Sequence, residues 1–202
     1  MPRVAGQIDL SKNEAILDAA VDVLAERGVS APMEEIARRA CVSKQTIYNH
    51  YGSKAELVRA VAERRVHEIT APLEAPEAME HPAEALAAYA REMLNALTRP
   101  RAAAFMRMAM LSAAEMPEVA QAWYEAGPRA SRLKLAEFLR METDAARLAI
   151  ADPLEAAEFF AGMAIGSYQT AALLGVVRPL SEAKIEAIAT EAAVRFMRAY
   201  AV

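Results

Sequence analysis

Helix start signals, apolar residues at helical spacing and helix stop signals follow one another along the whole chain. The first set begins at Ser11, whose hydroxyl can accept a hydrogen bond from the amide of residue 14 while the Glu14 side chain reaches back. Gly28 then supplies a residue that tolerates the left-handed backbone at a helix end. Apolar residues between these two signals recur at intervals of three and four: Ile16, Ala19, Ala20, Val23 and Leu24. This pattern predicts a helix over residues 12–27.

The same signals predict helices along the rest of the chain, and strand-like alternation is hard to find. Short helices are expected at residues 32–40, 44–51 and 54–69, with a three-residue turn at 41–43 and a stop at Gly52. Three prolines and several acids at residues 71–82 indicate a linker. Prolines at first-turn positions then predict longer helices: 82–97, 100–114, 117–140 with a kink at Gly127 and Pro128, 153–174 and 181–200. Only 7 glycines and many good helix formers agree with an all-α fold.

The composition excludes several classes of protein. Cys41 is the single cysteine, so an internal disulfide and a multi-thiol zinc site are both excluded. No apolar run is long enough for a signal peptide or a membrane span. The chain contains no phosphate loop, Ser-His-acid arrangement or metal-ligand cluster. We therefore expect a cytoplasmic protein that has no membrane partner, is not an enzyme, and carries no cofactor and no metal.

The segment SKQTIYNHYGSK, residues 43–54, lies in a stretch without acids. From residue 36 to residue 55 there are four cations and no Asp or Glu: Arg38, Arg39, Lys44 and Lys54. Two short helices joined by a tight turn form a helix-turn-helix, whose second helix can enter the major groove of DNA. A stretch without acids suits this placement, because a carboxylate there would repel phosphates.

Helical spacing divides the second helix into two faces. Ile47 and Tyr51 are four residues apart and are expected to face the core. The outward face is then made by Lys44, Gln45, Tyr48 and Asn49, with Thr46 and His50 at its flanks. Lysine and glutamine can bond base edges, while hydroxyl groups and the histidine ring can bond phosphate oxygens.

Residues 12–61, and in particular IARRACVSKQTIYNHYGSKAEL, resemble the DNA-binding domain of the TetR family of transcriptional regulators. The resemblance implies that Lys44, Gln45, Thr46, Tyr48 and His50 meet double-stranded DNA, and that Lys54 holds a phosphate. Two positions depart from the family pattern. Cys41 stands where the family usually has glycine, so we expect it to take a positive φ at a cost of roughly 1 kcal/mol, as a small buried residue of the turn. Pro32 replaces the usual Thr or Ser cap, and Ser30 or Ala31 is expected to cap instead.

Residues 106–166 are similar to the C-terminal domain of a TetR subgroup that includes the AefR-like repressors. The resemblance implies a domain of residues 71–202 that binds a small lipophilic effector and forms a homodimer, beside a three-helix helix-turn-helix domain of residues 1–70. Methionine and aromatic side chains suit an adaptable apolar pocket. The expected lining is Met106, Met110, Trp123, Tyr124, Phe159, Met163, Tyr168 and Gln169.

The expected dimer surface lies on the last two long helices. It consists of Ala156, Ala157, Phe160, Ala164, Ala171 and Ala172 on one helix, and of Ile185, Ile188, Ala192, Phe196 and Met197 on the other. Together these features predict a ligand-responsive regulator, a repressor that binds a palindromic operator as a dimer. A helical ligand-binding or adaptor protein that has lost DNA binding remains the alternative.

Overall fold

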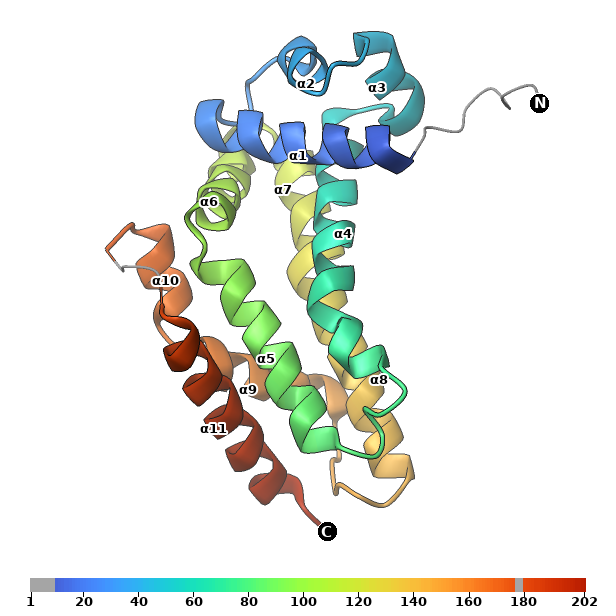
Figure 1. Cartoon of the computed structure of the whole chain (residues 1–202), viewed down its shortest axis with the longest axis vertical. Coiled ribbons are helices and arrows are strands. Elements are labelled where there is room, and N and C mark those ends of the chain that lie inside the picture. The colour runs from blue at the N-terminus through green and yellow to red at the C-terminus, as the bar shows by residue number, and fades with distance from the viewer. Residues whose placement is uncertain (1–9, 177–179) are drawn as a thin grey trace, which may run out of the picture. The chain divides into compact units, whose positions relative to one another are not determined.

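The computed structural model describes residues 10–176 and 180–202, and over these ranges it contains helices and no strand (Figure 1). The prediction of an all-α protein is confirmed. The elements are α1 (Leu10–Arg27), α2 (Met33–Arg39), α3 (Lys44–Tyr51), α4 (Lys54–Glu74), α5 (Pro82–Thr98), α6 (Pro100–Glu115), α7 (Pro117–Tyr124), the π-helix η1 (Glu125–Arg129), α8 (Ala130–Asp144), α9 (Pro153–Ile165), α10 (Tyr168–Leu173) and α11 (Glu182–Tyr200). None of these helices is long and apolar enough to cross a membrane.

The described chain groups into two compact units. Unit 1 takes in the described residues up to Arg64 together with Arg101–Ala126, and unit 2 takes in Arg65–Pro100 and the described residues from Gly127 onward. Helices α6 and α7 thus belong to the unit that contains the helix-turn-helix. The domain boundary expected at residues 70–71 is a different division of the chain, and it stays a prediction.

The core of unit 1 gathers the apolar faces of α1 to α4 with side chains from α6 and α7. Helix α1 packs on α2 and α2 packs on α3 (Figure 1). The fully buried side chains of this cluster are Ile16, Ala20, Val23, Leu24, Ile36, Ile47, Leu57, Val58 and Val119. The helical spacing that predicted α1 therefore also predicts which of its residues face the core.

The turn between α2 and α3 has the left-handed residue that the sequence predicts. Cys41 adopts φ 53°, and the amide of Val42 donates to the carbonyl of Ala37 at 3.0 Å, which closes the end of α2. The Cys41 side chain is exposed, so the expectation that it is buried is wrong. The N-cap residue of α2 is Pro32 itself, and no side-chain hydrogen bond caps the helix, so the expectation that Ser30 or Ala31 takes this place is wrong.

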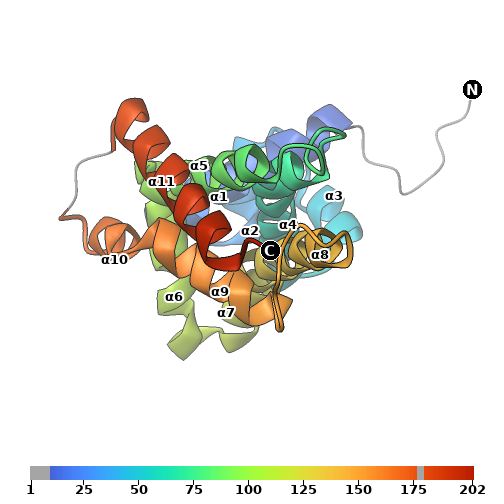
Figure 2. The same ribbon diagram turned by 90° about the horizontal axis from the view of Figure 1, so that it is seen from below.

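Unit 2 is a bundle in which α11 packs along α5 and α9, and α8 packs on α9. Figure 2 shows these helices from one end of the bundle, with α9 beside α8 and α11. Aromatic rings occupy its centre: the centroids of Phe160 and Phe196 are 5.2 Å apart, edge to face, and Tyr89 lies 6.1 Å from Phe160. Offset and edge-to-face contacts of this kind add specific geometry to the burial of apolar area.

Two of the expected helices differ in extent from the sequence prediction, and an expected kink takes a specific form. Helix α4 does not end before Pro72 but continues to Glu74, because Leu73 and Thr70 on either side of the proline are buried. The linker expected at residues 71–82 is correspondingly shorter. The helix expected at residues 153–174 is broken at Gly166, which takes φ 50° after its amide closes α9. The kink expected at Gly127 and Pro128 coincides with η1, a π-helical turn.

Most of the side chains expected at the dimer surface are core residues of the single chain. On α9, Ala156, Ala157, Phe160 and Ala164 are at most 1% exposed, and on α11 Phe196 is fully buried. For these buried residues the prediction of an interface between two chains is therefore wrong. Partly buried members of the same set stay a prediction: Ala171, Ala172, Ile188 and Met197. Spacing alone could not assign every apolar residue of α9 to a face, because Phe159 and Met163 lie on the outward side together with Glu155 and Glu158.

Candidate nucleic-acid interface

The orientation of α3 follows from a cap at each end and one buried anchor. Ser43 accepts a hydrogen bond from the amide of Thr46 at 3.0 Å, and Gly52 ends the helix with φ 73°. Ile47 is 0% exposed in the core of unit 1. Since Ile47 faces inward, the opposite side of α3 must face solvent, which is the arrangement that the sequence predicts.

The side chains expected to read DNA are exposed and contact one another. The amide nitrogen of Gln45 donates to the Asn49 side-chain oxygen at 2.6 Å. The Lys44 ammonium lies 5.5 Å from the centroid of the Tyr48 ring, within the range of a cation–π contact. Thr46 is partly buried, with its hydroxyl 2.7 Å from that of Ser43. The outward face of α3 is therefore a continuous polar surface.

The stretch without acids in the sequence is not free of acids in space. Arg39 forms two parallel hydrogen bonds with Glu26, at 2.7 and 2.8 Å. Lys44 is hydrogen-bonded to Glu34, and this contact lowers the pKa of the Glu34 carboxyl and raises the pKa of the Lys44 ammonium. Arg38 lies more loosely, 3.7 Å from Glu35. Three of the four cations thus have a carboxylate partner in the free protein.

Lys54, the fourth cation, is bound to the backbone between α1 and α2. Its ammonium donates to the carbonyls of Val29, at 2.5 Å, and Ala31, at 2.8 Å. Burial lowers the pKa of Lys54. An ammonium has three donors, so one N–H remains for the phosphate that the family resemblance implies. In this structure Lys54 thus connects the start of α4 to the segment between α1 and α2 by hydrogen bonds.

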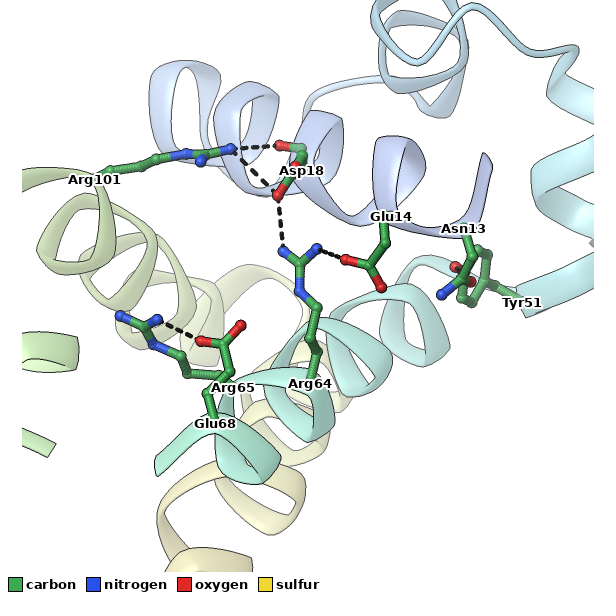
Figure 3. A network of polar contacts seen from close by, with 8 residues as sticks. All are labelled: Asn13, Glu14, Asp18, Tyr51, Arg64, Arg65, Glu68 and Arg101. Carbon is green, nitrogen blue, oxygen red and sulfur yellow. Dashed lines mark hydrogen bonds and ion pairs between the residues drawn. The ribbon is translucent and has the colours of Figure 1, made fainter. Parts of the chain in front are cut away.

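The last residue of α3 is joined to the first turn of α1 by a hydrogen bond between Tyr51 and Asn13 (Figure 3). The Tyr51 hydroxyl donates to the Asn13 side-chain oxygen at 2.6 Å, and burial raises the pKa of Tyr51 to about 12. His50 lies edge to face against the Tyr51 ring, at 4.6 Å between centroids. Because Tyr51 is partly buried and held by α1, it positions α3 rather than projecting toward DNA.

Asp18 of α1 is the centre of an ion-pair network within unit 1. Arg64 of α4 reaches both Glu14, at 2.7 Å, and Asp18, at 3.0 Å (Figure 3). Arg101 of α6 donates to the backbone carbonyl of Asp18 at 3.0 Å and pairs with Asp22 at 2.6 Å. These contacts tie α4 and α6 to the helix on which the helix-turn-helix packs.

Sequence reasoning missed the acidic partners of the interface, Glu34 and Glu26. Each lies at least ten residues from its cation in the sequence, beyond the helical spacing at which charge pairs can be recognised. Glu34 lies in the first turn of α2, where an acid is expected for the helix dipole alone. No local signal therefore marks it as the partner of Lys44.

The eight residues expected to line an effector pocket are divided between the two units. In unit 1, Met106 is buried, Trp123 is partly buried against the core, and Met110 and Tyr124 are exposed. In unit 2, Tyr168 and Gln169 are partly buried, whereas Phe159 and Met163 are 57% and 41% exposed on α9. A hollow of about 460 Å³ in unit 2 is lined by none of the eight: its residues are Arg91, Asn95, Arg99, Glu182, Ala183, Ile185 and Glu186.

A capped, outward-facing helix α3, anchored by Ile47 in a helix-turn-helix, defines a DNA-binding regulator. Residues 16–61 match the family of bacterial regulatory proteins called the tetR family, and residues 84–202 match the AefR-like transcriptional repressor C-terminal domain. The chain belongs to the TetR family of transcriptional regulators. These are regulators rather than enzymes, in agreement with the prediction.

Individual relatives agree with this assignment. The HTH-type transcriptional activator FasR of Mycolicibacterium smegmatis is 50% identical over 52 residues, which are 25% of this chain and 24% of that protein. The HTH-type transcriptional regulator SrpR of Pseudomonas putida is 40% identical over 55 residues, 27% of this chain and 26% of that protein. The chain thus spans about a quarter of the length of these curated relatives.

Two solved structures are similar over nearly the whole chain. A putative TetR-family transcriptional regulator from Mesorhizobium loti has a TM-score of 0.76 at 25% identity, covering 96% of this chain and 100% of that one. The Flavonoid-responsive Regulator FrrA has a TM-score of 0.70 at 31% identity, covering 94% of this chain and 97% of that one. The likeness therefore includes unit 2 as well as the helix-turn-helix.

Proposed function

We propose that this protein is a ligand-responsive repressor that binds a palindromic DNA operator as a homodimer and is released by a small lipophilic effector. The observation that supports DNA binding is the outward face of α3, on which Lys44, Gln45, Tyr48 and Asn49 are all exposed while Ile47 is buried. Gln45 and Asn49 have the side-chain amides that pair with adenine in the major groove. The proposed phosphate contacts are Thr46, Tyr48, His50 and Lys54, together with Lys44, which can also bond a base edge.

Binding to phosphates is an exchange of partners in this proposal. Lys44 must leave Glu34 to reach a phosphate, whereas Lys54 uses its third N–H and keeps both carbonyl partners. The two lysines therefore contribute differently: Lys44 to affinity alone, and Lys54 to both the fold of unit 1 and affinity.

The proposed dimer uses the outer face of α9. On the side of α9 that faces away from the core of unit 2, two large apolar side chains four residues apart are exposed to solvent: Phe159 and Met163, which are 57% and 41% exposed. Exposed apolar groups gathered on one helix favour a protein contact, and a two-fold axis would bring the same face of a second chain against them. Two copies of α3 spaced by one DNA turn, about 34–36 Å, could then read a palindrome.

A response to a small molecule is supported by the relatives. FrrA, which resembles this chain over nearly its full length, is a flavonoid-responsive regulator, and unit 2 contains most of the residues that match the AefR-like repressor domain. Coupling between the two ligands is reciprocal. An effector that weakens operator binding a hundredfold must itself bind the DNA-bound protein about 2.7 kcal/mol more weakly.

Selection of duplexes from a random-sequence pool by the full chain tests DNA binding directly. The selected duplex should contain an inverted repeat, and its affinity should fall steeply with salt because phosphate contacts release counterions. Recovery of no duplex would favour the alternative of a helical adaptor protein. Transcription in vitro from a promoter carrying the selected site then distinguishes repression, the expected result, from the activation named for FasR.

Sedimentation of the Phe159→Glu variant tests the dimer. The substitution places a charge in the proposed interface and should produce monomers that still contain the wild-type helix content. Thr190→Glu on the exposed face of α11 is the matched control and should remain dimeric. A dimeric Phe159→Glu protein would refute the α9 surface.

A further inference from the structure

Unit 2 contains a mostly buried arginine, Arg132, whose guanidinium lacks good hydrogen-bond acceptors within the described residues. The side chain of Arg132, on α8, is only 13% exposed, and its Nε is buried with no hydrogen-bond acceptor among the described residues. Its Nη1 reaches the Tyr89 hydroxyl at 3.4 Å and the Met93 sulfur at 3.7 Å, both from α5. These distances are longer than those of good hydrogen bonds, so the guanidinium is poorly compensated.

A second arginine in unit 2 shows what a structural ion pair looks like in this chain. Arg147 donates two hydrogen bonds, at 2.6 and 2.9 Å, to the fully buried carboxylate of Glu142. This fork-to-fork geometry satisfies both groups. Arg132 has no carboxylate in this fork geometry, and a buried charge that is poorly paired destabilises the fold relative to an apolar side chain of similar size. Its position therefore suggests a partner from outside the chain.

The nearest carboxylate to Arg132 is a weak and movable one. Glu158 of α9 places an oxygen 3.4 Å from Nε, without hydrogen-bond geometry, and its side chain is 62% exposed. Because Glu158 is held by so little, it can rotate into solvent and leave the guanidinium to another anion. The Tyr89 hydroxyl, which lies 2.8 Å from the Ser131 hydroxyl, is within reach of the same position.

We propose that Arg132 and the Tyr89 hydroxyl receive the anionic end of an amphiphilic ligand, a carboxylate on an apolar body, in exchange for Glu158. The side chains beside the guanidinium are apolar, which suits an apolar body: Met93 is 4% exposed, and the Tyr89 ring packs toward Phe160 in the core of unit 2. Because these side chains are packed, they must move apart to admit the ligand. The inference rests on the proposed function only in identifying this ligand with the effector. Binding of the ligand to unit 2 does not depend on whether the protein binds DNA.

Calorimetric titration of the full chain, without DNA, tests this site. The probes are straight-chain carboxylates from hexanoate to dodecanoate, with the alcohols of equal length for comparison. Wild-type protein should bind a carboxylate of this series at least about tenfold more tightly than the matching alcohol, because only the anion forms charge-assisted hydrogen bonds with the guanidinium. Arg132→Met should abolish this preference.

Matched variants separate a local effect from a change in net charge. Arg140→Met removes a surface arginine of the same helix, one that pairs with Glu137 and Asp144, and should leave carboxylate binding unchanged. Glu158→Gln removes the internal competitor and should tighten binding, whereas Glu155→Gln, on the same helix, should not. Arg132→Lys keeps the charge but loses the planar fork, so its affinity should be intermediate.

Three outcomes would overturn the proposal: no carboxylate of the series binds wild-type protein, the alcohols bind as tightly as the carboxylates, or Arg132→Met binds like wild type. Thermal unfolding checks that Arg132→Met folds, and if it does not, Arg132→Lys and Glu158→Gln decide. Operator binding by ligand-free Arg132→Met should equal that of wild type. Failure of wild-type protein to bind any operator would refute the proposed function, while the titrations would still decide the role of Arg132.

Discussion

Replacing Lys54 by methionine should both destabilise the protein and weaken its binding to DNA. The ammonium donates to two backbone carbonyls, those of Val29 and Ala31, and methionine keeps most of the apolar stem while removing both bonds. A hydrogen bond to a charged group contributes about 1.5–3 kcal/mol when it is buried. Lys54 is only half-buried, so water replaces part of the loss, and we expect the free energy of unfolding to fall by roughly 1–2 kcal/mol.

Thermal unfolding of Lys54→Met measures this loss. For a chain of this size, 1 kcal/mol moves the unfolding midpoint by about 2–4 °C, so the variant should melt roughly 2–8 °C below wild type. Lys44→Met is the matched control, because the side chains of Lys44 and its partner Glu34 are 49% and 55% exposed and an exposed ion pair contributes little; its midpoint should stay close to that of wild type.

DNA binding separates the two roles of Lys54. If its third N–H holds a phosphate, Lys54→Met should bind the selected operator and a scrambled duplex more weakly by the same factor, since phosphates carry no sequence information. If Lys54→Met melts at the wild-type temperature, the hydrogen bonds from Lys54 to the segment between α1 and α2 do not stabilise the protein, and this part of the reasoning is refuted. Unchanged affinity for both duplexes, with a lowered midpoint, would leave Lys54 a structural residue alone.

Five further substitutions test the interface and the local backbone. Lys44→Gln should reduce the slope of log affinity against log salt by about 0.9, the value for one phosphate contact, and Gln45→Ala should relax preference at one base position of the selected operator. Cys41→Gly should raise the free energy of unfolding by about 0.5–1 kcal/mol by relieving φ 53°, and Ala146→Gly, at φ 55°, should do the same without touching the interface. Burial raises the pKa of Tyr51 from 10.0 to about 12, so the stability that Tyr51 contributes should be complete below pH 10 and lost toward pH 12. Tyr51→Phe should remove this loss. Denaturant unfolding at each pH measures it.

The helix-turn-helix could be predicted almost residue by residue, because its signals are local. The bounds of α3, Lys44 to Tyr51, are those expected from Ser43 and Gly52. Caps and stops act through hydrogen bonds between residues at most four apart, and helical spacing places Ile47 inward. A reading of neighbouring residues is sufficient for features of this kind.

Features of unit 2 depend on which of two competing preferences prevails, and the sequence does not decide between them. Pro72 lacks an amide and disfavours helix, yet burial of Leu73 keeps α4 helical to Glu74. On α9 the residues expected at the dimer surface are buried in the core, while Phe159 and Met163, expected in a pocket, are exposed. The outward face of α9 carries the apolar Phe159 and Met163 beside Glu155 and Glu158, so only the packing of α8 and α11 against the helix shows which of its apolar residues are inside.

The ion pairs around α3 show why the absence of acids in a segment does not by itself make a positive surface. Lys44 is paired with Glu34 and Arg39 with Glu26, although neither acid lies near its cation in the sequence. A phosphate must displace a carboxylate to reach Lys44, so nonspecific DNA gains less from this lysine than it would from a free cation. Base contacts by Gln45 and Asn49 form only at the correct sequence. Their favourable binding energy therefore offsets the loss of the Lys44–Glu34 ion pair only at that sequence. The carboxylate partners should therefore lower affinity for all DNA and leave discrimination between sequences intact, and Glu34→Gln should tighten binding to the operator and to a scrambled duplex by the same factor.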